Sequence, residues 1–99
     1  MAKLAKVHPG EVLKEEFLAP LNISANKFAK HIGVPTNRIT AIINGTRGVT
    51  GETALLFGKA FNMSAQFWLN LQNAYDLREA INKDEKRIEK IEPLPEIAA

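Results

Sequence analysis

Four polar side chains within one short stretch carry the functional groups that distinguish base pairs. An asparagine amide can pair bidentately with adenine, an arginine guanidinium with guanine, and threonine offers a hydroxyl and a methyl group to thymine. The residues that we predict to read bases are Thr36, Asn37, Arg38 and Thr40. They fall in the first half of a predicted helix over residues 35–44, which begins at a proline and ends at a glycine. Arg38 suits a phosphate equally well, and the sequence does not choose between the two roles.

Polar and basic residues on both sides of this stretch suit the phosphate backbone of a duplex. Some open another predicted helix, over residues 25–32, where free amides and the helix dipole attract an anion. Others lie in a glycine-containing loop after residue 43, which permits close approach to DNA. The predicted phosphate contacts are Ser24, Asn26, Lys27, Asn44, Thr46 and Arg47. For any one of these residues, an ordinary solvated position is an equally good explanation.

The two helices that carry these residues have the spacing of a helix-turn-helix. Ala29 supplies the small side chain required where the helices cross, and Gly33, four residues later, permits the positive φ of the turn. Apolar residues at inward spacing would lock both helices onto a core: Phe28, Ile32, Val34, Ile39 and Ile42. The alternative is an ordinary helical hairpin inside a bundle. The polar outer face of the second helix favours DNA binding.

Three further helices are predicted around this pair, and no alternating pattern indicates a strand. The first covers residues 11–18 and is bounded by Pro9 and Pro20. The next begins at Thr50 or Gly51, and the last is capped by Ser64. The predicted fold class is therefore all-α.

The chain divides into three predicted parts. Residues 1–7 form an N-terminal arm, and residues 8–82 form the DNA-binding and dimerisation domain. Residues 83–99 form a charged helical extension whose end, from Leu94 to Ala99, is predicted to be frayed.

The last predicted helix is apolar along two stripes. One stripe contains Phe67, Leu71, Ala74 and Ile81, and the other contains Trp68, Tyr75 and Leu77. One stripe can cover the helix-turn-helix, and a second subunit would then bury the other. A twofold axis would set two recognition helices about 34 Å apart on a palindromic site, so we predict a homodimer. The alternative is that Trp68 and Tyr75 complete the core of a single chain.

Charge and composition agree with a DNA-binding protein. Residues 1–50 carry seven basic and three acidic side chains, whereas residues 51–99 carry six and eight, so the positive charge lies on the predicted docking half. The chain has no cysteine, its beginning is too polar for a signal peptide, and no apolar run is long enough to span a membrane. We expect a cytoplasmic protein.

Other classes of function find little support. His8 and His31 lack the spacing of metal ligands, and no Ser-His-Asp arrangement or phosphate-binding glycine loop is present. We therefore expect no catalysis, no metal and no cofactor. Binding of single-stranded RNA would need exposed aromatic residues, but the phenylalanines are better placed in a core: Phe28, Phe57, Phe61 and Phe67. A module that binds only another protein remains an alternative.

Three segments together resemble the HigA-type antitoxins, phage-repressor-like proteins of bacterial type II toxin–antitoxin modules. They are residues 8–11 (HPGE), residues 33–47 with Val49 and Thr50 (GVPTNRITAIINGTR in the first part), and residues 67–77 (FWLNLQNAYDL). The resemblance covers residues 8–80 and is more specific than the helix-turn-helix alone. It implies a five-helix, lambda repressor-like domain.

The resemblance also implies dimerisation through the C-terminal region and binding of an operator upstream of the protein's own operon. Its implied partner is a small ribosome-dependent, mRNA-cleaving toxin that the antitoxin neutralises. The family's DNA-contacting face corresponds here to Thr36, Asn37, Arg38, Thr40 and the loop 44–47. No pattern identifies residues that contact the toxin. An orphan phage-type repressor without a toxin is the alternative.

Overall fold

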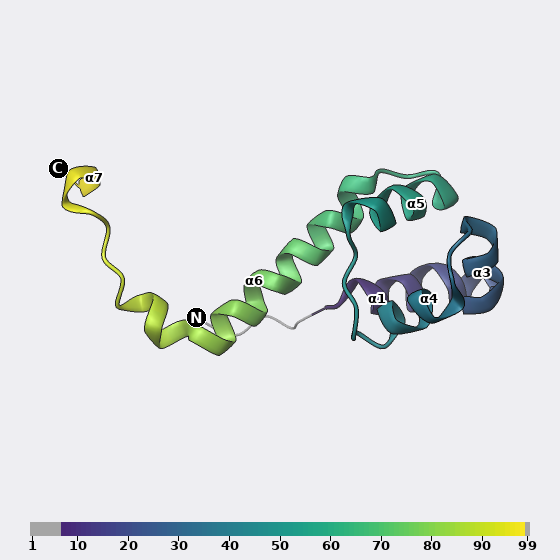
Figure 1. Cartoon of the computed structure of the whole chain (residues 1–99), viewed down its shortest axis with the longest axis horizontal. Coiled ribbons are helices and arrows are strands. Elements are labelled where there is room, and N and C mark those ends of the chain that lie inside the picture. Colours follow the sequence, from purple (N-terminus) through teal and green to yellow (C-terminus); the bar gives the residue numbers. More distant parts are fainter. Residues whose placement is uncertain (1–6, 99) are drawn as a thin grey trace.

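The computed structural model describes residues 7–98, and every regular element in that part of the chain is helical. In chain order the elements are α1 (Pro9–Val12), the π-helical segment η1 (Leu13–Leu18), α2 (Ala19–Leu21), α3 (Ala25–Ile32), α4 (Thr36–Ile43), α5 (Gly51–Phe61), α6 (Ala65–Glu89) and α7 (Pro95–Ala98). Figure 1 shows α1, α3, α4 and α5 gathered at one end of the molecule, with α6 projecting away from them. The extents are 55 × 24 × 21 Å. The all-α prediction is confirmed. Of the arm predicted at residues 1–7, all but the last residue, Val7, lies outside the described residues.

The first helical stretch is longer than the sequence suggests. α1, η1 and α2 follow one another without a break from Pro9 to Leu21, so the predicted end before Pro20 is wrong. A proline lacks an N–H donor and crowds the carbonyl four residues earlier. Pro20, however, lies at the start of α2, directly after the wider turns of η1. The chain leaves the helix at Asn22, which adopts the left-handed conformation with φ 55°.

Hydroxyl side chains begin three of the other helices at the predicted positions. Ser24, Thr50 and Ser64 each accept a hydrogen bond from a backbone N–H in the first turn of α3, α5 and α6. Pro35 was predicted as the first residue of its helix, but it is extended and precedes α4. The end of the chain also differs from the frayed segment expected, because Pro95–Ala98 form the short helix α7.

Aromatic side chains join the beginning of α6 to the body, as we call the group of helices from α1 to α5 at one end of the molecule. Trp68 is fully buried, and its ring centroid lies 5.0 Å from that of Phe57 on α5 and 5.2 Å from that of Phe17 on η1. Phe28 of α3 packs on Phe57 from another side, with 5.5 Å between centroids. Trp68 thus completes the core of a single chain, as the alternative interpretation held. Phe67 was predicted in the core but is 39% exposed.

α1 and α4 touch backbone to backbone at Gly10. A Cβ atom added at Gly10 would overlap the carbonyl oxygen of Ile42, so no other residue fits without separating the helices. Ile42 and Ile39 are themselves fully buried. α4 is therefore held firmly from its inner side, which fixes the direction of its outer side.

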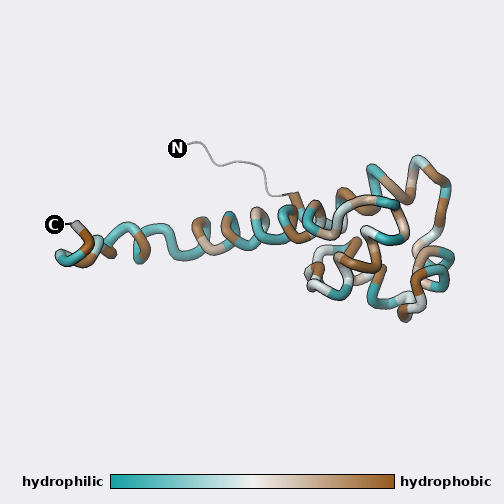
Figure 2. The backbone as a smooth tube through the Cα atoms, turned by 90° about the horizontal axis from the view of Figure 1, so that it is seen from above, coloured by the Kyte–Doolittle hydropathy of each residue, from teal (hydrophilic) through white to brown (hydrophobic). Residues whose placement is uncertain are grey.

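Beyond the body, α6 carries apolar side chains in solvent. Leu77 is 64% exposed, Ile81 46% and Ile88 45%, and brown segments along the projecting helix in Figure 2 mark such residues. The exposed residues come from both predicted stripes, Leu77 from that of Trp68 and Tyr75 and Ile81 from the other, whereas Trp68 itself is buried. The helix is interrupted at Asp84, whose φ and ψ are not helical. No helix within residues 7–98 is long and apolar enough to cross a membrane.

Candidate nucleic-acid interface

The pair α3 and α4 has the geometry that the sequence predicts for a helix-turn-helix. The Ser24 hydroxyl caps α3 by accepting a hydrogen bond from the Lys27 N–H at 3.0 Å. Gly33 ends the helix with φ 75°, and the N–H of Val34 then donates to the carbonyl of Ala29 at 3.0 Å. Ala29 is fully buried, as expected at the crossing of two helices. The turn therefore delivers α4 at a fixed angle.

Three of the predicted base-reading residues of α4 differ in their exposure and in their hydrogen bonds to the rest of the protein. Asn37 is exposed, and its side-chain amide makes no hydrogen bond within the described residues. Thr36 is half-buried and donates its hydroxyl to the Asn26 side-chain oxygen of α3 at 2.8 Å. Thr40 is also half-buried, and its hydroxyl donates to the carbonyl of Asn37 at 3.2 Å. Asn37 is thus the most available polar group on this helix.

Arg38 is held by a carboxylate that the sequence reasoning missed. Its Nη1 donates to Oε1 of Glu52 at 2.9 Å, and the two side chains are 24% and 72% exposed. Its Nε is buried without a hydrogen-bond partner among the described residues. Glu52 lies in the first turn of α5, where the helix dipole stabilises a negative charge. Nothing in the sequence links it to Arg38. The guanidinium therefore reaches the outer surface with its direction already set.

The loop after α4 is shaped by its own backbone bonds. Gly45 has φ 80°, which a residue with a side chain rarely adopts. The Thr46 hydroxyl donates to the carbonyl of Ala41 at 3.2 Å and so ties the loop back to α4. Asn44 and Arg47 are exposed. The loop thus offers polar groups from a fixed position at the end of the helix.

Gln72 of α6 anchors the far end of this loop and was not predicted. Its Oε1 accepts the N–H of Val49 at 2.7 Å, and its Nε2 donates to Asp76 at 2.9 Å. A Cβ atom added at Gly48 would lie 3.0 Å from the same amide. A glutamine between apolar positions of α6 was the only available signal. This contact connects the loop to the helix that leaves the body.

His8 supports the same loop from below. Its Nδ1 accepts the N–H of Gly10 at 2.9 Å, and its ring meets the ring of Tyr75 edge-on at 4.8 Å. His8 and Tyr75, together with Asn44 and Gly45, line a hollow of about 300 Å³. Burial lowers the pKa of His8, against the opposing effect of Asp76 and Glu11, and the accepting Nδ1 requires the neutral ring. His8 is therefore a structural residue here.

The predicted phosphate contacts lie at the two ends of α4. Asn26 is bonded to Thr36 at the beginning of the helix, and Ser24 and Lys27 share its end of α3. The loop 44–47 lies at the other end, about 12 Å away for a helix of eight residues. The structure thus places one polar cluster at each end of α4.

The comparisons with known proteins agree with this geometry. A helix-turn-helix family model matches residues 13–68. The curated Antitoxin HigA-1 of Vibrio cholerae is 37% identical over 93% of this chain and 87% of its own length. Virulence-associated protein I of Dichelobacter nodosus is 44% identical over 93% of this chain and 84% of its own. These matches and the fold place the chain among the DNA-binding helix-turn-helix proteins.

Solved structures narrow the assignment. An addiction module antidote protein of the HigA family from Coxiella burnetii superimposes with a TM-score of 0.86 and 48% identity, covering 91% of this chain and 99% of that one. The Pseudomonas aeruginosa antitoxin HigA, solved with the higBA promoter, gives a TM-score of 0.87 at 38% identity with the same coverage. The chain belongs to the HigA family of antitoxins.

Proposed function

We propose that this protein is an antitoxin that represses its own operon by binding a palindromic operator, and that it neutralises a cognate mRNA-cleaving toxin in the cytoplasm. The observation that carries the proposal is the outer side of α4, where Asn37 is exposed on a helix whose other side is buried through Ile39 and Ile42. Relatives of the same fold are antitoxins solved with promoter or operator DNA, which supports the same role.

We assign base reading to the first half of α4. Asn37 supplies an amide for an adenine edge, while Thr36 and Thr40 supply methyl groups and the remaining lone pairs of their hydroxyls. Arg38 presents its free Nη2 to a base while Glu52 holds Nη1. Such buttressing fixes the direction of a long side chain before DNA arrives, which reduces the conformational entropy lost on binding.

Phosphate contacts are assigned to both ends of the same helix. Ser24, Asn26 and Lys27 act at the start of α3, where free N–H groups attract an anion. Asn44, Thr46 and Arg47 act from the loop, whose shape is set by Gly45 and by the bond from Thr46 to Ala41. These contacts position the protein on the duplex without reading its sequence.

We assign dimerisation to the exposed apolar side chains of α6. Leu77 and Ile81 lie on successive turns and are 64% and 46% exposed within the described part of the chain. A twofold pair would place two copies of α4 about 34 Å apart, one turn of B-DNA. Residues 8–82 then form the DNA-binding and dimerisation domain, and residues 83–99 form an extension that begins near the interruption at Asp84.

Operator binding is tested by fluorescence anisotropy with the promoter DNA upstream of the protein's own gene. Asn37→Ala should weaken operator binding by about 1–3 kcal/mol while affinity for random DNA changes little. Asn82→Ala is the matched control, because Asn82 is an exposed asparagine on α6. Equal affinity of the wild-type protein for promoter and random DNA would refute sequence-specific repression.

Toxin neutralisation needs a separate test. Some relatives are described only as HTH-type transcriptional regulators, one of them 38% identical over 92% of this chain, which keeps a repressor without a toxin as the second candidate. Expression of the neighbouring small reading frame should arrest growth, and co-expression of this protein should relieve the arrest. A neighbouring gene with no toxicity would favour the second candidate.

A further inference from the structure

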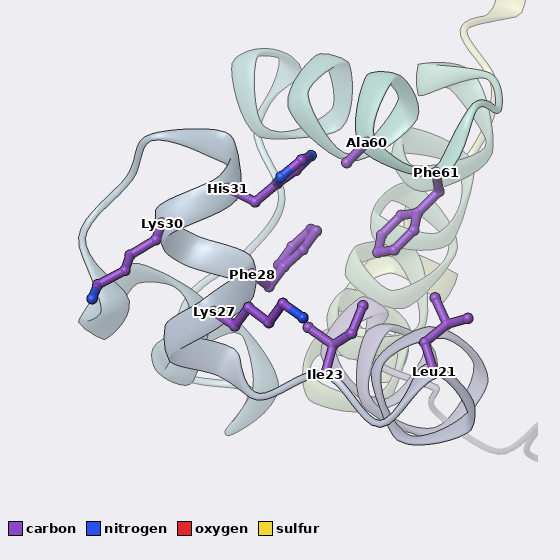
Figure 3. A pocket seen from close by; sticks show the side chains of 8 residues that line it. All are labelled: Leu21, Ile23, Lys27, Phe28, Lys30, His31, Ala60 and Phe61. Carbon is purple, nitrogen blue, oxygen red and sulfur yellow. The ribbon is translucent and has the colours of Figure 1, made fainter.

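An open apolar groove lies on the body beside the helix-turn-helix. It has a volume of about 520 Å³, within the range of pockets that hold a ligand or an anchoring side chain. Its wall is formed by Leu21 at the end of α2, Ile23, Phe28 of α3, and Ala60 with Phe61 of α5 (Figure 3). The rings of Phe28 and Phe61 are stacked with 5.1 Å between centroids. Leu21 is 58% exposed, so solvent reaches apolar carbon here.

Basic residues of α3 edge the groove, and none of its lining residues is acidic. Lys27 extends its ammonium toward Ile23, across the mouth of the groove, and the ring of His31 points toward Ala60, whereas Lys30 points outward (Figure 3). Lys27 has no carboxylate partner among the described residues. The groove therefore suits an occupant that combines aliphatic side chains with negative charge.

The C-terminal segment of the same chain has this chemistry. Residues 92–97 alternate acidic, proline and aliphatic residues, and all of them are exposed. Leu94 is 64% and Ile97 76% exposed, and Glu92 and Glu96 lie beside them in sequence. Figure 1 shows α7 at one end of the molecule and the body at the other, so α6 holds this segment far from the groove of its own chain.

We propose that the groove receives the C-terminal segment, residues 92–97, of a second copy of this chain. Leu94 and Ile97 fill the apolar floor between Leu21 and Phe61, and the carboxylate of Glu96 pairs with Lys27. Both surfaces are exposed in the single chain and complementary in hydropathy and charge, and docking removes both from water.

Disulfide trapping tests the docking directly, because the natural chain contains no cysteine. In the full-length double variant Leu21→Cys/Ile97→Cys, mild oxidation should give covalent dimers joined between residues 21 and 97, identified by mass spectrometry, because a disulfide requires the two Cα atoms within about 7 Å. The control is Leu55→Cys/Ile97→Cys, since Leu55 is 67% exposed on α5 but does not line the groove. No bridge above this control, or a bridge within one chain, would overturn the proposal.

A charge exchange tests the pairing of Glu96 with Lys27. In the double-cysteine background, Glu96→Lys should reduce the yield of the bridge, and adding Lys27→Glu should restore it. A yield that ignores both substitutions would overturn the pairing. Binding of a medium-chain carboxylate such as decanoate in the groove, without any bridge, would identify a small amphiphile as the occupant and overturn the proposal too.

Docking has a consequence for DNA that rests on the proposed phosphate contact of Lys27. The docked segment covers Lys27, so the variant Leu94→Glu/Ile97→Glu should bind the operator about tenfold more tightly than the wild type, the usual size of such coupling. Unchanged affinity would remove the coupling. Disulfide trapping is performed without DNA, so its outcome does not depend on whether operator binding is established.

Discussion

The outer side of α4 and the projecting half of α6 are both exposed, but their chemistry differs. On α4 the exposed group is the amide of Asn37, and the opposite side of the helix is buried through Ile39 and Ile42. On α6 the exposed groups are Leu77 and Ile81. Polar groups on a rigid support suit hydrogen bonding to base edges, whereas aliphatic groups in water favour another protein surface. The difference supports our proposals that α4 binds DNA and that α6 mediates self-association.

The largest expected effect is on self-association. Leu77→Glu/Ile81→Glu should weaken the dimer by about 3–6 kcal/mol, since burial of each aliphatic side chain contributes about 1.5–3 kcal/mol. Analytical ultracentrifugation should show a monomer at concentrations where the wild type is a dimer. Leu55→Glu, a change at an equally exposed residue of α5, is the control. Dimers that persist in the α6 variant would erase the division between the two helices.

A smaller effect is expected where α4 contacts α5. Glu52→Gln removes the charge that fixes Arg38, so discrimination between operator and random DNA should fall by about 1 kcal/mol, within the value of one base contact. The free energy of unfolding should fall by less than about 1 kcal/mol, because Glu52 is largely exposed. Arg38→Gln should lose the discrimination as well, and the double variant should lose no more than Arg38→Gln alone. Additive losses would show that Glu52 acts without Arg38.

His8 lies where the two surfaces meet, between the loop after α4 and Tyr75 of α6. Its pKa in the folded protein is lowered by burial, so folding favours the neutral ring. The contribution of His8 to the free energy of unfolding is therefore fully present above the ordinary histidine pKa of 6.5. It is lost as the pH falls from that value through the lowered pKa of the folded protein. Urea unfolding, measured from about pH 8 to about pH 5, should show this loss, because histidine titrates within that range. His8→Asn should flatten the dependence, and an unchanged slope would contradict the assignment.

The smallest expected effect belongs to a single phosphate contact. Arg47→Ala should lower the slope of log K against log salt concentration by about 0.9 and weaken operator and random DNA alike. Lys59→Ala removes an equally exposed charge from α5 and should leave the slope unchanged. A loss of sequence discrimination in Arg47→Ala would mean that the loop reads bases.

Much of the fold was predictable because its signals are local. Ser24, Gly33, Thr50 and Ser64 begin or end helices through bonds within a few residues, and the structure has each of them as predicted. Pro20 misled the prediction, since the π-helical turns before it carry the helix onward to Leu21.

The long-range contacts were not predictable. Arg38 and Glu52 are 14 residues apart, and Val49 and Gln72 are 23 apart, so only the packing of α5 and α6 against the helix-turn-helix brings them together. Trp68 also needed the structure, because periodicity alone cannot say which side of α6 faces the body.

The contact between Gly10 and Ile42 constrains how this protein can acquire a new target. Because the backbones of α1 and α4 are in direct contact, α4 cannot tilt or slide without separating α1 from the other helices. A change of operator preference must therefore come from exchanging side chains at positions such as Asn37, on a scaffold that keeps its orientation. Gly10 thus fixes the orientation of α4, while the side chains on the outer side of this helix can be exchanged.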